Sequence, residues 1–177
     1  PIKLRIKLGV ERLWLRFFQK NANRVVVQTA SMKELTCNCV SAPVSIAPFV
    51  TFPEAGTFRN NKDEGNKKYN FIYVASGDPH KNHKNLIDAW VELGKEGLFP
   101  SLCLTVNSAA FPQLVAFIKS KKQQYELNIE NIGSVTGEDA LELYKSAETL
   151  IFPSTLESFG LPLIEARATG LRVVASE

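Results

Sequence analysis

Short apolar runs recur through the second half of the chain, each followed by a polar turn. The runs are 69–75 (YNFIYVA), 101–106 (SLCLTV), 128–135 (NIENIGSV), 149–154 (TLIFPS) and 171–176 (LRVVAS). Each predicts a strand, because β-branched and aromatic residues dominate it and turn residues bound it. Runs that are apolar throughout are typical of strands covered on both faces of a sheet.

Between these runs, apolar residues recur at the spacing of amphipathic helices. The helical segments are 82–96, 112–125, 137–147 and about 161–169. Strands that alternate with helices predict a parallel sheet with helices on both faces, and right-handed crossovers then give a Rossmann-like doubly wound unit. The predicted fold class is therefore α/β.

The first fifty residues follow a different pattern. Residues 3–20 (KLRIKLGVERLWLRFFQK) carry apolar side chains at helical spacing, and their basic residues fall mostly on other faces. This helix either packs on its own domain or lies as a basic amphipathic helix on an anionic membrane. Residues 24–29 and 42–50 are expected to be extended, and 31–35 begins like a helix capped by Ser31.

Residues 51–68 separate these two patterns. The segment is polar, rich in Asn, Lys and Gly, and without periodicity, so it predicts a linker between residues 1–50 and residues 69–177. The chain lacks an initiating Met and stops at LRVVASE, which reads as a strand with nothing after it. We therefore expect a fragment of a longer protein.

Composition narrows the class of protein only a little. Hydrophobic residues make up 45% and charged residues 22%, as in an ordinary soluble globular protein. A net charge of +3 is too small to indicate a nucleic-acid partner. The chain has three cysteines, Cys37, Cys39 and Cys103, and their spacing is not that of metal ligands. An odd number of cysteines favours a reduced, cytoplasmic compartment. No run approaches the roughly 20 apolar residues of a membrane span.

The turns that follow the predicted strands are the places to look for chemistry. In a doubly wound sheet, ligands bind in the crevice beyond the carboxyl ends of the strands. In the turn 153–163, Pro162 suits the first position of a helix, so the amides of Gly160 and Leu161 would face that crevice. A helix N-terminus carries about half a positive charge and attracts phosphate.

Two glutamates flank this turn at a separation of eight positions. Glu157 precedes the turn, and Glu165 lies about one turn into the predicted helix. Carboxylates accept paired hydrogen bonds from hydroxyls, and a nucleotide-sugar offers hydroxyls on its hexose and its ribose with a diphosphate between them. The alternative is that each glutamate only complements the helix dipole. The pattern alone leaves both open.

The turn 75–85 (ASGDPHKNHKN) offers Lys81 as a cation for a diphosphate. The alternative is an ordinary solvated surface lysine. His80 and His83 flank Lys81, but nothing nearby supplies a third ligand, so a metal site is not expected.

These segments resemble a known family. Residues 152–176 (FPSTLESFGLPLIEARATGLRVVAS) resemble the signature of the retaining GT-B glycosyltransferases of family four, also called glycosyl transferases group one, whose hallmark is Glu-x7-Glu. Residues 73–90 look like the family's first strand and phosphate loop of the C-terminal domain, and 135–154 like the segment that leads into the signature. Residues 1–50 are similar to the end of its N-terminal acceptor domain.

The resemblance implies a role for individual residues. Glu157 would bind the hexose of the donor, Glu165 its ribose and Lys81 its diphosphate, with Glu157 and Lys81 as the catalytic pair. The backbone around the Phe-Gly pair and one further turn would line the rest of the donor site: Ser158, Phe159, Gly160, Leu161, Gly133 and Val135. Ser76 belongs to the same site and stands where the family usually has an arginine paired with the lysine.

The resemblance also implies a function. It predicts transfer of a hexose from a nucleoside-diphosphate sugar to a glycan or lipid-linked acceptor, with retention of configuration and without a metal or other cofactor. Bacterial capsule or lipopolysaccharide assembly is the expected pathway, with peripheral contact at the inner membrane. The isolated fragment is expected not to turn over. The alternative is a non-catalytic homologue or partner subunit that binds sugar nucleotides, which Ser76 keeps open.

Overall fold

The computed structural model describes residues 2–47, 67–157 and 159–176. The chain divides into two compact units, Pro1–Pro53 and Glu54–Glu177, and each is described by itself. The predicted linker, residues 51–68, lies outside the described residues except at its last two positions, as does the end of the predicted extended segment 42–50.

The smaller unit is a helix followed by a β-α-β segment. Its elements are α1 (Ile2–Phe18), the short 3₁₀ helix η1 (Gln19–Asn21), β1 (Val25–Val27), α2 (Ala30–Cys37) and β2 (Val44–Ile46). Helix α1 confirms the helix predicted for residues 3–20. Strand β1 pairs in parallel with β2, which confirms the extended segments predicted within 24–29 and 42–50. Helix α2 is capped by Thr29, whose extended backbone lets its hydroxyl accept from the Met32 N–H at 3.2 Å. The predicted Ser31 cap is wrong, because Ser31 is already inside the helix.

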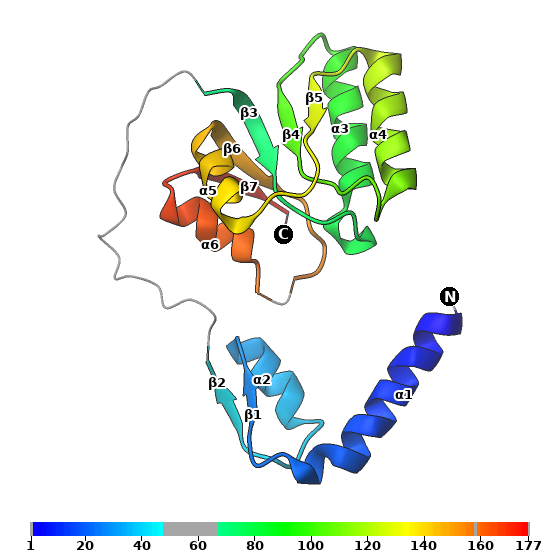
Figure 1. The fold of residues 1–177 in the computed structure, drawn as a ribbon, viewed down its shortest axis with the longest axis vertical. Coiled ribbons are helices and arrows are strands. Elements are labelled where there is room, and N and C mark those ends of the chain that lie inside the picture. The colour runs from blue at the N-terminus through cyan, green and yellow to red at the C-terminus, as the bar shows by residue number, and fades with distance from the viewer. Residues whose placement is uncertain (1, 48–66, 158, 177) are drawn as a thin grey trace. The chain divides into compact units, whose positions relative to one another are not determined.

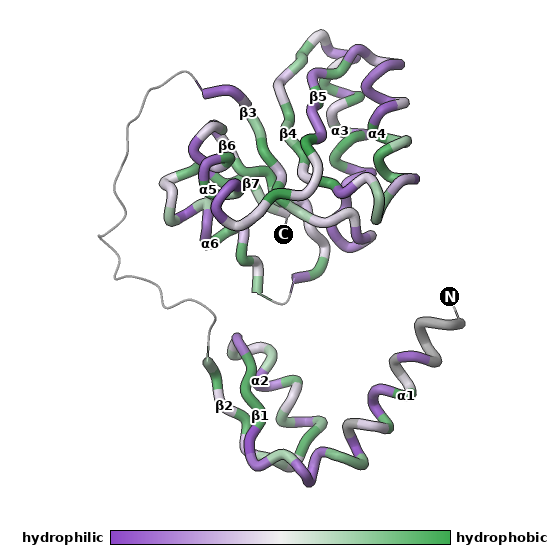
Figure 2. The backbone as a smooth tube through the Cα atoms, in the orientation of Figure 1, coloured by the Kyte–Doolittle hydropathy of each residue, from purple (hydrophilic) through white to green (hydrophobic). Residues whose placement is uncertain are grey.

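Helix α1 has an apolar stripe formed by Val10, Leu13, Trp14, Phe17 and Phe18. All of these side chains are exposed, and the Trp14 and Phe18 rings lie 5.4 Å apart. Figure 2 shows hydrophobic and hydrophilic positions interspersed along α1. The stripe agrees with the predicted amphipathic pattern. Within the described part of the chain, neither α1 nor any other helix is long and apolar enough to cross a bilayer.

The larger unit is a parallel sheet between two layers of helices. Its strands are β3 (Tyr69–Tyr73), β4 (Leu102–Leu104), β5 (Ile129–Asn131), β6 (Ala147–Phe152) and β7 (Arg172–Ala175), in the order β5-β4-β3-β6-β7. Its helices are α3 (His83–Lys95), α4 (Pro112–Tyr125), α5 (Gly137–Lys145) and α6 (Leu161–Ala168), preceded by the 3₁₀ turn η2 (Pro79–Lys81). Helices α3 and α4 cover one face of the sheet, and α5 and α6 cover the other (Figure 1). The predicted α/β doubly wound fold is confirmed.

The core of this unit lies where the central strands meet α3. Ile72 of β3 and Leu104 of β4 are fully buried, and Ile87 of α3 is buried with them. Trp90 sets the edge of its ring against Phe71 at 5.3 Å between ring centroids, and its indole N–H donates to the Pro100 carbonyl at 2.9 Å. Each large apolar side chain buried in this way contributes roughly 1.5–3 kcal/mol.

The strand order reverses beside β3. From β3 the chain builds β4 and then β5 on one side, and then returns to build β6 and β7 on the other. Because β3 and β6 are parallel neighbours, the loops at their carboxyl ends start side by side. This topological switch point is where doubly wound sheets bind their ligands.

Candidate functional site

Tyr73 ties the two loops of the switch point together. It ends β3, is fully buried, and its hydroxyl donates to the Lys81 carbonyl at 2.8 Å. The same hydroxyl lies 2.7 Å from Ser154 Oγ, in the loop after β6. Burial raises the pKa of Tyr73 to about 12, so the phenol keeps its proton and remains a donor. Asn82 adds a second tie, because its side-chain amide donates to the Pro153 carbonyl at 3.1 Å.

Lys81 and Glu157 meet across these loops although they lie 76 positions apart in the chain. Lys81 Nζ is 2.6 Å from Glu157 Oε1, and the two side chains are 17% and 21% exposed. These fractions separate the pair from the ion pairs of the surface, such as Lys145–Glu142 with 55% and 73% exposure. A pair that is mostly buried, as this one is, is screened less by solvent than an exposed pair. The attraction between the two side chains therefore fixes their positions.

The environment keeps the Glu157 carboxylate ionised. Burial by itself raises its pKa, but the hydrogen bonds from Lys81 and Ser154 and the charge of Lys81 outweigh burial, so the pKa is lowered from its ordinary value. At neutral pH the Glu157 side chain of this pair is therefore a carboxylate, held in place by Lys81.

Helix α6 begins next to this pair in the sequence, in a way that leaves its first turn open. Gly160 is the residue before the helix, with φ of 73°, a left-handed conformation that glycine adopts without strain. Pro162 occupies the first turn, and no side chain caps the helix. Pro162 has no N–H, and the Leu163 N–H donates to the Gly160 carbonyl at 3.0 Å, so the donors that α6 can offer at this end are the N–H groups of Gly160 and Leu161, together with a partial positive charge.

Glu165 lies inside α6 and has a partner that the sequence analysis missed. The hydroxyl of Tyr144, in α5, donates to Glu165 Oε2 at 2.9 Å. Tyr144 is almost completely buried, and burial is the largest cause that raises its pKa, followed by the charge of Glu165. The hydrogen bond fixes the orientation of the carboxylate through one of its two oxygens. The helical spacing of residues 137–147 predicts a helix that contains Tyr144, but it does not predict where the hydroxyl points.

The other predicted site residues fall in different places. Ser76 and Val135 line one cavity of about 330 Å³, together with Thr105, Asn107 and Phe111, at the carboxyl ends of β3, β4 and β5. Ser76 donates to Asp78 Oδ2 at 2.6 Å.

Gly133 lies in the loop after β5 with φ of 83°, and it lines a different cavity, on the α4 side of β5. Leu161 is exposed, and Phe159 is half-buried. Ser158 lies outside the described residues. The structure thus brings together Lys81 with Glu157 and Ser76 with Val135. It places Glu165 against Tyr144.

No group of three or more His, Cys, Asp or Glu side chains suited to a metal occurs in the described segments. Lys81 and the partial charge at the N-terminus of α6 are positive groups at the switch point.

A doubly wound sheet with this strand order is the Rossmann-like architecture of the nucleotide-binding domains in GT-B glycosyltransferases. Residues 55–177 match the family Glycosyl transferases group 1, and the chain belongs to this family. The predicted resemblance is therefore confirmed at the level of the family.

Two curated relatives come from Escherichia coli. The O-antigen chain mannosyltransferase B is 30% identical over 105 residues, which are 59% of this chain and 28% of the relative. The serotype-specific mannosyltransferase WbdA is 31% identical over 104 residues, which are 59% of this chain and 13% of the relative. The aligned part is thus less than a third of either relative.

Solved structures share the fold at lower identity. Anabaena HepE in complex with UDP and glucose has a TM-score of 0.67 at 15% identity, covering 93% of this chain and 47% of its own. The sucrose-phosphate synthase of Thermosynechococcus elongatus has a TM-score of 0.67 at 24% identity, covering 97% of this chain and 44% of its own.

The ion pair predicts how stability depends on pH. Since the pKa of Glu157 is lowered on folding, its contribution is fully present above the unfolded value of 4.5 and is lost as the pH falls through the folded pKa. We expect Glu157→Gln to lower the free energy of unfolding by about 1 kcal/mol at pH 7. The difference from wild type should disappear in acid. Urea titrations at stepped pH measure it, with Glu142→Gln as the exposed control; a difference that persists below the folded pKa would contradict the assignment.

Proposed function

We propose that this chain is the donor-binding part of a glycosyltransferase that moves a hexose from a nucleoside-diphosphate sugar to an acceptor hydroxyl, with retention of configuration. The observation that carries the proposal is the mostly buried Lys81–Glu157 ion pair at the switch point. Family membership supports transferase chemistry. The E. coli relatives are named as O-antigen and serotype-specific mannosyltransferases, which supports a role in bacterial surface polysaccharide assembly.

In the proposed complex, the diphosphate lies at the N-terminus of α6, where the Gly160 and Leu161 backbone and Lys81 compensate its charge. Glu157 accepts hydrogen bonds from hexose hydroxyls, and Glu165 accepts them from the ribose, held in place by Tyr144. Phe159 continues the wall of the donor site, and Ser158 keeps the donor-binding role that the sequence resemblance implies. The base lies towards Gly133 and Val135, beyond Ser76.

The proposed reaction forms the new glycosidic bond on the face from which the diphosphate departs. The bond between the anomeric carbon and the diphosphate oxygen breaks, the acceptor oxygen bonds to that carbon, and the acceptor proton passes to the departing diphosphate. The protein's part is to stabilise the growing charge on the diphosphate and to hold both sugars in position.

We further propose that the protein works inside the cell next to the membrane. The acceptor is a glycan or lipid-linked glycan, and the exposed apolar stripe of α1, with Lys7, Arg12 and Arg16 on the same helix, supports contact with an anionic bilayer.

The second candidate is a non-catalytic subunit that binds sugar nucleotides. Ser76 favours it, because a serine hydroxyl that donates to Asp78 supplies no cation for the diphosphate. Binding and transfer assays distinguish the two candidates.

The 177-residue chain should bind UDP- or GDP-sugars weakly, since its aligned part spans less than a third of the relatives that it matches. Glu157→Gln should weaken this binding by roughly 10- to 100-fold, because a hydrogen bond to a charged group contributes about 1.5–3 kcal/mol. Calorimetric titration measures the effect, and Glu142→Gln on the exposed face of α5 is the matched control. Equal affinity in both variants would remove Glu157 from the donor site.

In a longer protein that contains this chain and an acceptor-binding domain, Glu157→Ala should reduce turnover by about 100-fold or more, comparable to the loss of one preorganised charge-stabilising contact. The readout is sugar transfer from radiolabelled donor, with circular dichroism as the check on folding. Wild-type turnover in a folded Glu157→Ala protein would overturn its role. Donor binding without any transfer by the unmodified protein would favour the non-catalytic candidate.

The same protein should transfer sugar without a divalent metal, because Lys81 and the α6 N-terminus are proposed to balance the charge of the diphosphate. Turnover in excess EDTA should stay within twofold of the untreated rate. Loss of activity that Mg²⁺ or Mn²⁺ restores would show that a cation shares this task.

A further inference from the structure

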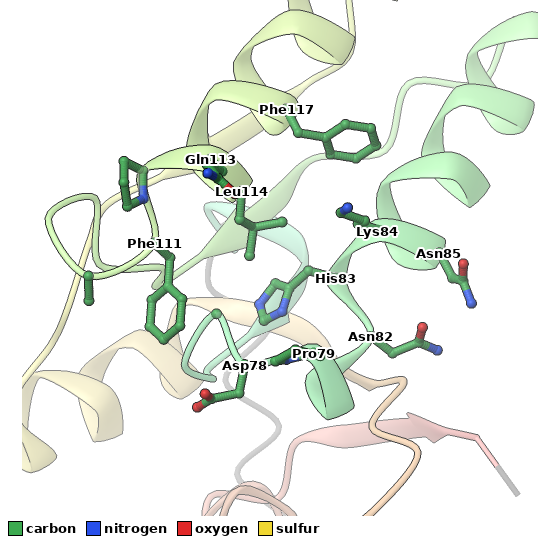
Figure 3. Close-up of a pocket in the computed structure, with 13 residues that line it drawn as sticks. Asp78, Pro79, Asn82, His83, Lys84, Asn85, Phe111, Gln113, Leu114 and Phe117 are labelled. Atoms are coloured by element: carbon green, nitrogen blue, oxygen red, sulfur yellow. The ribbon is translucent and has the colours of Figure 1, made fainter. Parts of the chain in front are cut away.

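A further cavity lies beside the loop that follows β3, where Gly77, Asp78 and Pro79 line it. It has a volume of about 710 Å³ and is bordered by the first turns of α3 and α4 (Figure 3). His83, Phe111, Leu114 and Phe117 form much of its wall, and Asn85 and Gln113 lie at its rim. Lys81, Glu157 and Glu165 do not line it, so it is distinct from the proposed donor site.

His83 is the unusual residue of this cavity. The side chain is 3% exposed, and neither ring nitrogen has a hydrogen-bond partner among the described residues. The centroids of the His83 and Tyr73 rings lie 4.9 Å apart. The His83 ring points into the space beside Phe111 and Leu114 (Figure 3). Leaving buried polar atoms unsatisfied costs about 1–3 kcal/mol, and such atoms are rare in folded proteins.

The charge state of His83 limits what can satisfy it. Burial, assisted by the nearby positive charge of Lys81, lowers the pKa of His83 to about 4, so the imidazole is neutral at physiological pH. A neutral imidazole offers one N–H donor and one acceptor nitrogen. A hydroxyl group can form a hydrogen bond with either ring nitrogen, because it both donates and accepts.

The remaining walls favour a neutral ligand with an apolar face. Phe111, Leu114 and Phe117 supply apolar surface, and the negative faces of aromatic rings attract the C–H groups of a ligand. Of the lining residues, Lys84 and Asp78 carry opposite charges that cancel, so the cavity has no net charge to neutralise. Amides such as Asn85 and Gln113 provide paired donors and acceptors at the rim.

We propose that this cavity binds a neutral sugar ring of a glycan, with a hydroxyl directed at His83 and the C–H face of the ring against the phenylalanines. A pyranose combines these features: hydroxyls around its edge and carbon-bound hydrogens on its face. Binding at this cavity does not depend on the transfer reaction. We further infer that this sugar belongs to the acceptor glycan, and this step rests on the proposed function.

Phe111 separates this cavity from the cavity that contains Ser76 and Val135, two residues of the proposed donor site. Its side chain lines both the 710 Å³ cavity and the 330 Å³ cavity that contains Ser76 and Val135. Gly77 leaves room for the Phe111 side chain, since a Cβ at position 77 would lie 2.8 Å from the Phe111 Cβ. A glycan in the larger cavity would therefore lie one side chain away from the strand-end cavity.

Nuclear magnetic resonance of the imidazoles tests the proposal, because the chain has two histidines, His80 and His83. His80 is exposed and serves as an internal control. The 177-residue chain is titrated with α-mannotriose, with maltotriose and, separately, with inorganic phosphate. We expect saturable shifts of the His83 ring signals and of the Gln113 and Phe117 backbone amides with a trisaccharide, while the His80 ring signals stay unchanged.

Variants assign the contacts. Phe117→Ala should weaken trisaccharide binding by up to roughly tenfold, the value of an aromatic contact, while Phe99→Ala, an exposed aromatic outside the cavity, should leave it unchanged. His83→Leu should weaken binding about fivefold, the value of one hydrogen bond, and keep the affinity for UDP-mannose within twofold. If His83→Leu does not fold, Gln113→Ala at the exposed rim replaces it.

The outcomes separate this proposal from the donor site. Saturable trisaccharide shifts at His83 that Phe117→Ala weakens would support it. Absence of such shifts at tens of millimolar sugar would overturn it, even if UDP-sugars still bind the chain. Shifts at His83 caused by phosphate alone would also overturn it, and would instead assign an anion to the first turns of α3 and α4.

Discussion

The site depends on the parallel pairing of β3 with β6. In that pairing Phe71 lies opposite Thr149 and Ile72 opposite Leu150, so the two strands end at the same edge of the sheet. Two loops that are distant in the sequence therefore begin next to each other, and the buried Tyr73 hydroxyl fastens them at Lys81 and Ser154. Without this register, Lys81 and Glu157 would be unrelated surface charges.

Burial and charge are balanced differently at the three polar side chains around this edge. Glu157 is partly desolvated but compensated by Lys81, which keeps it ionised. Glu165 has a neutral donor, Tyr144, which orients it without cancelling its charge. His83 is desolvated and has no partner in the described chain, which keeps it neutral. The loops around this edge thus hold both an ion pair, Lys81–Glu157, and a buried neutral imidazole, His83.

This contrast suits a protein that handles two chemically different substrates. In the proposed donor site, Lys81 and the α6 N-terminus would supply the positive charge that a diphosphate needs. In the proposed glycan site, the cavity around His83 would supply apolar surface and a partner for a hydroxyl. Phe111 lies between the two, since it lines both cavities. Family membership and the match to glycan-building relatives agree with such a division, although the aligned part covers less than a third of those relatives.

The sequence by itself determined the order and type of the elements and pointed to the pair of glutamates. Apolar runs and helical spacing are local properties, so they predicted the strands and helices of the larger unit, and the Gly160–Pro162 turn predicted the open start of α6. Partners were decided only in three dimensions. The sequence does not reveal that Lys81 bonds Glu157, that Tyr144 holds Glu165, or that the His83 ring is unpaired. These contacts depend on strand register and on side-chain direction across layers, which join residues far apart in the chain.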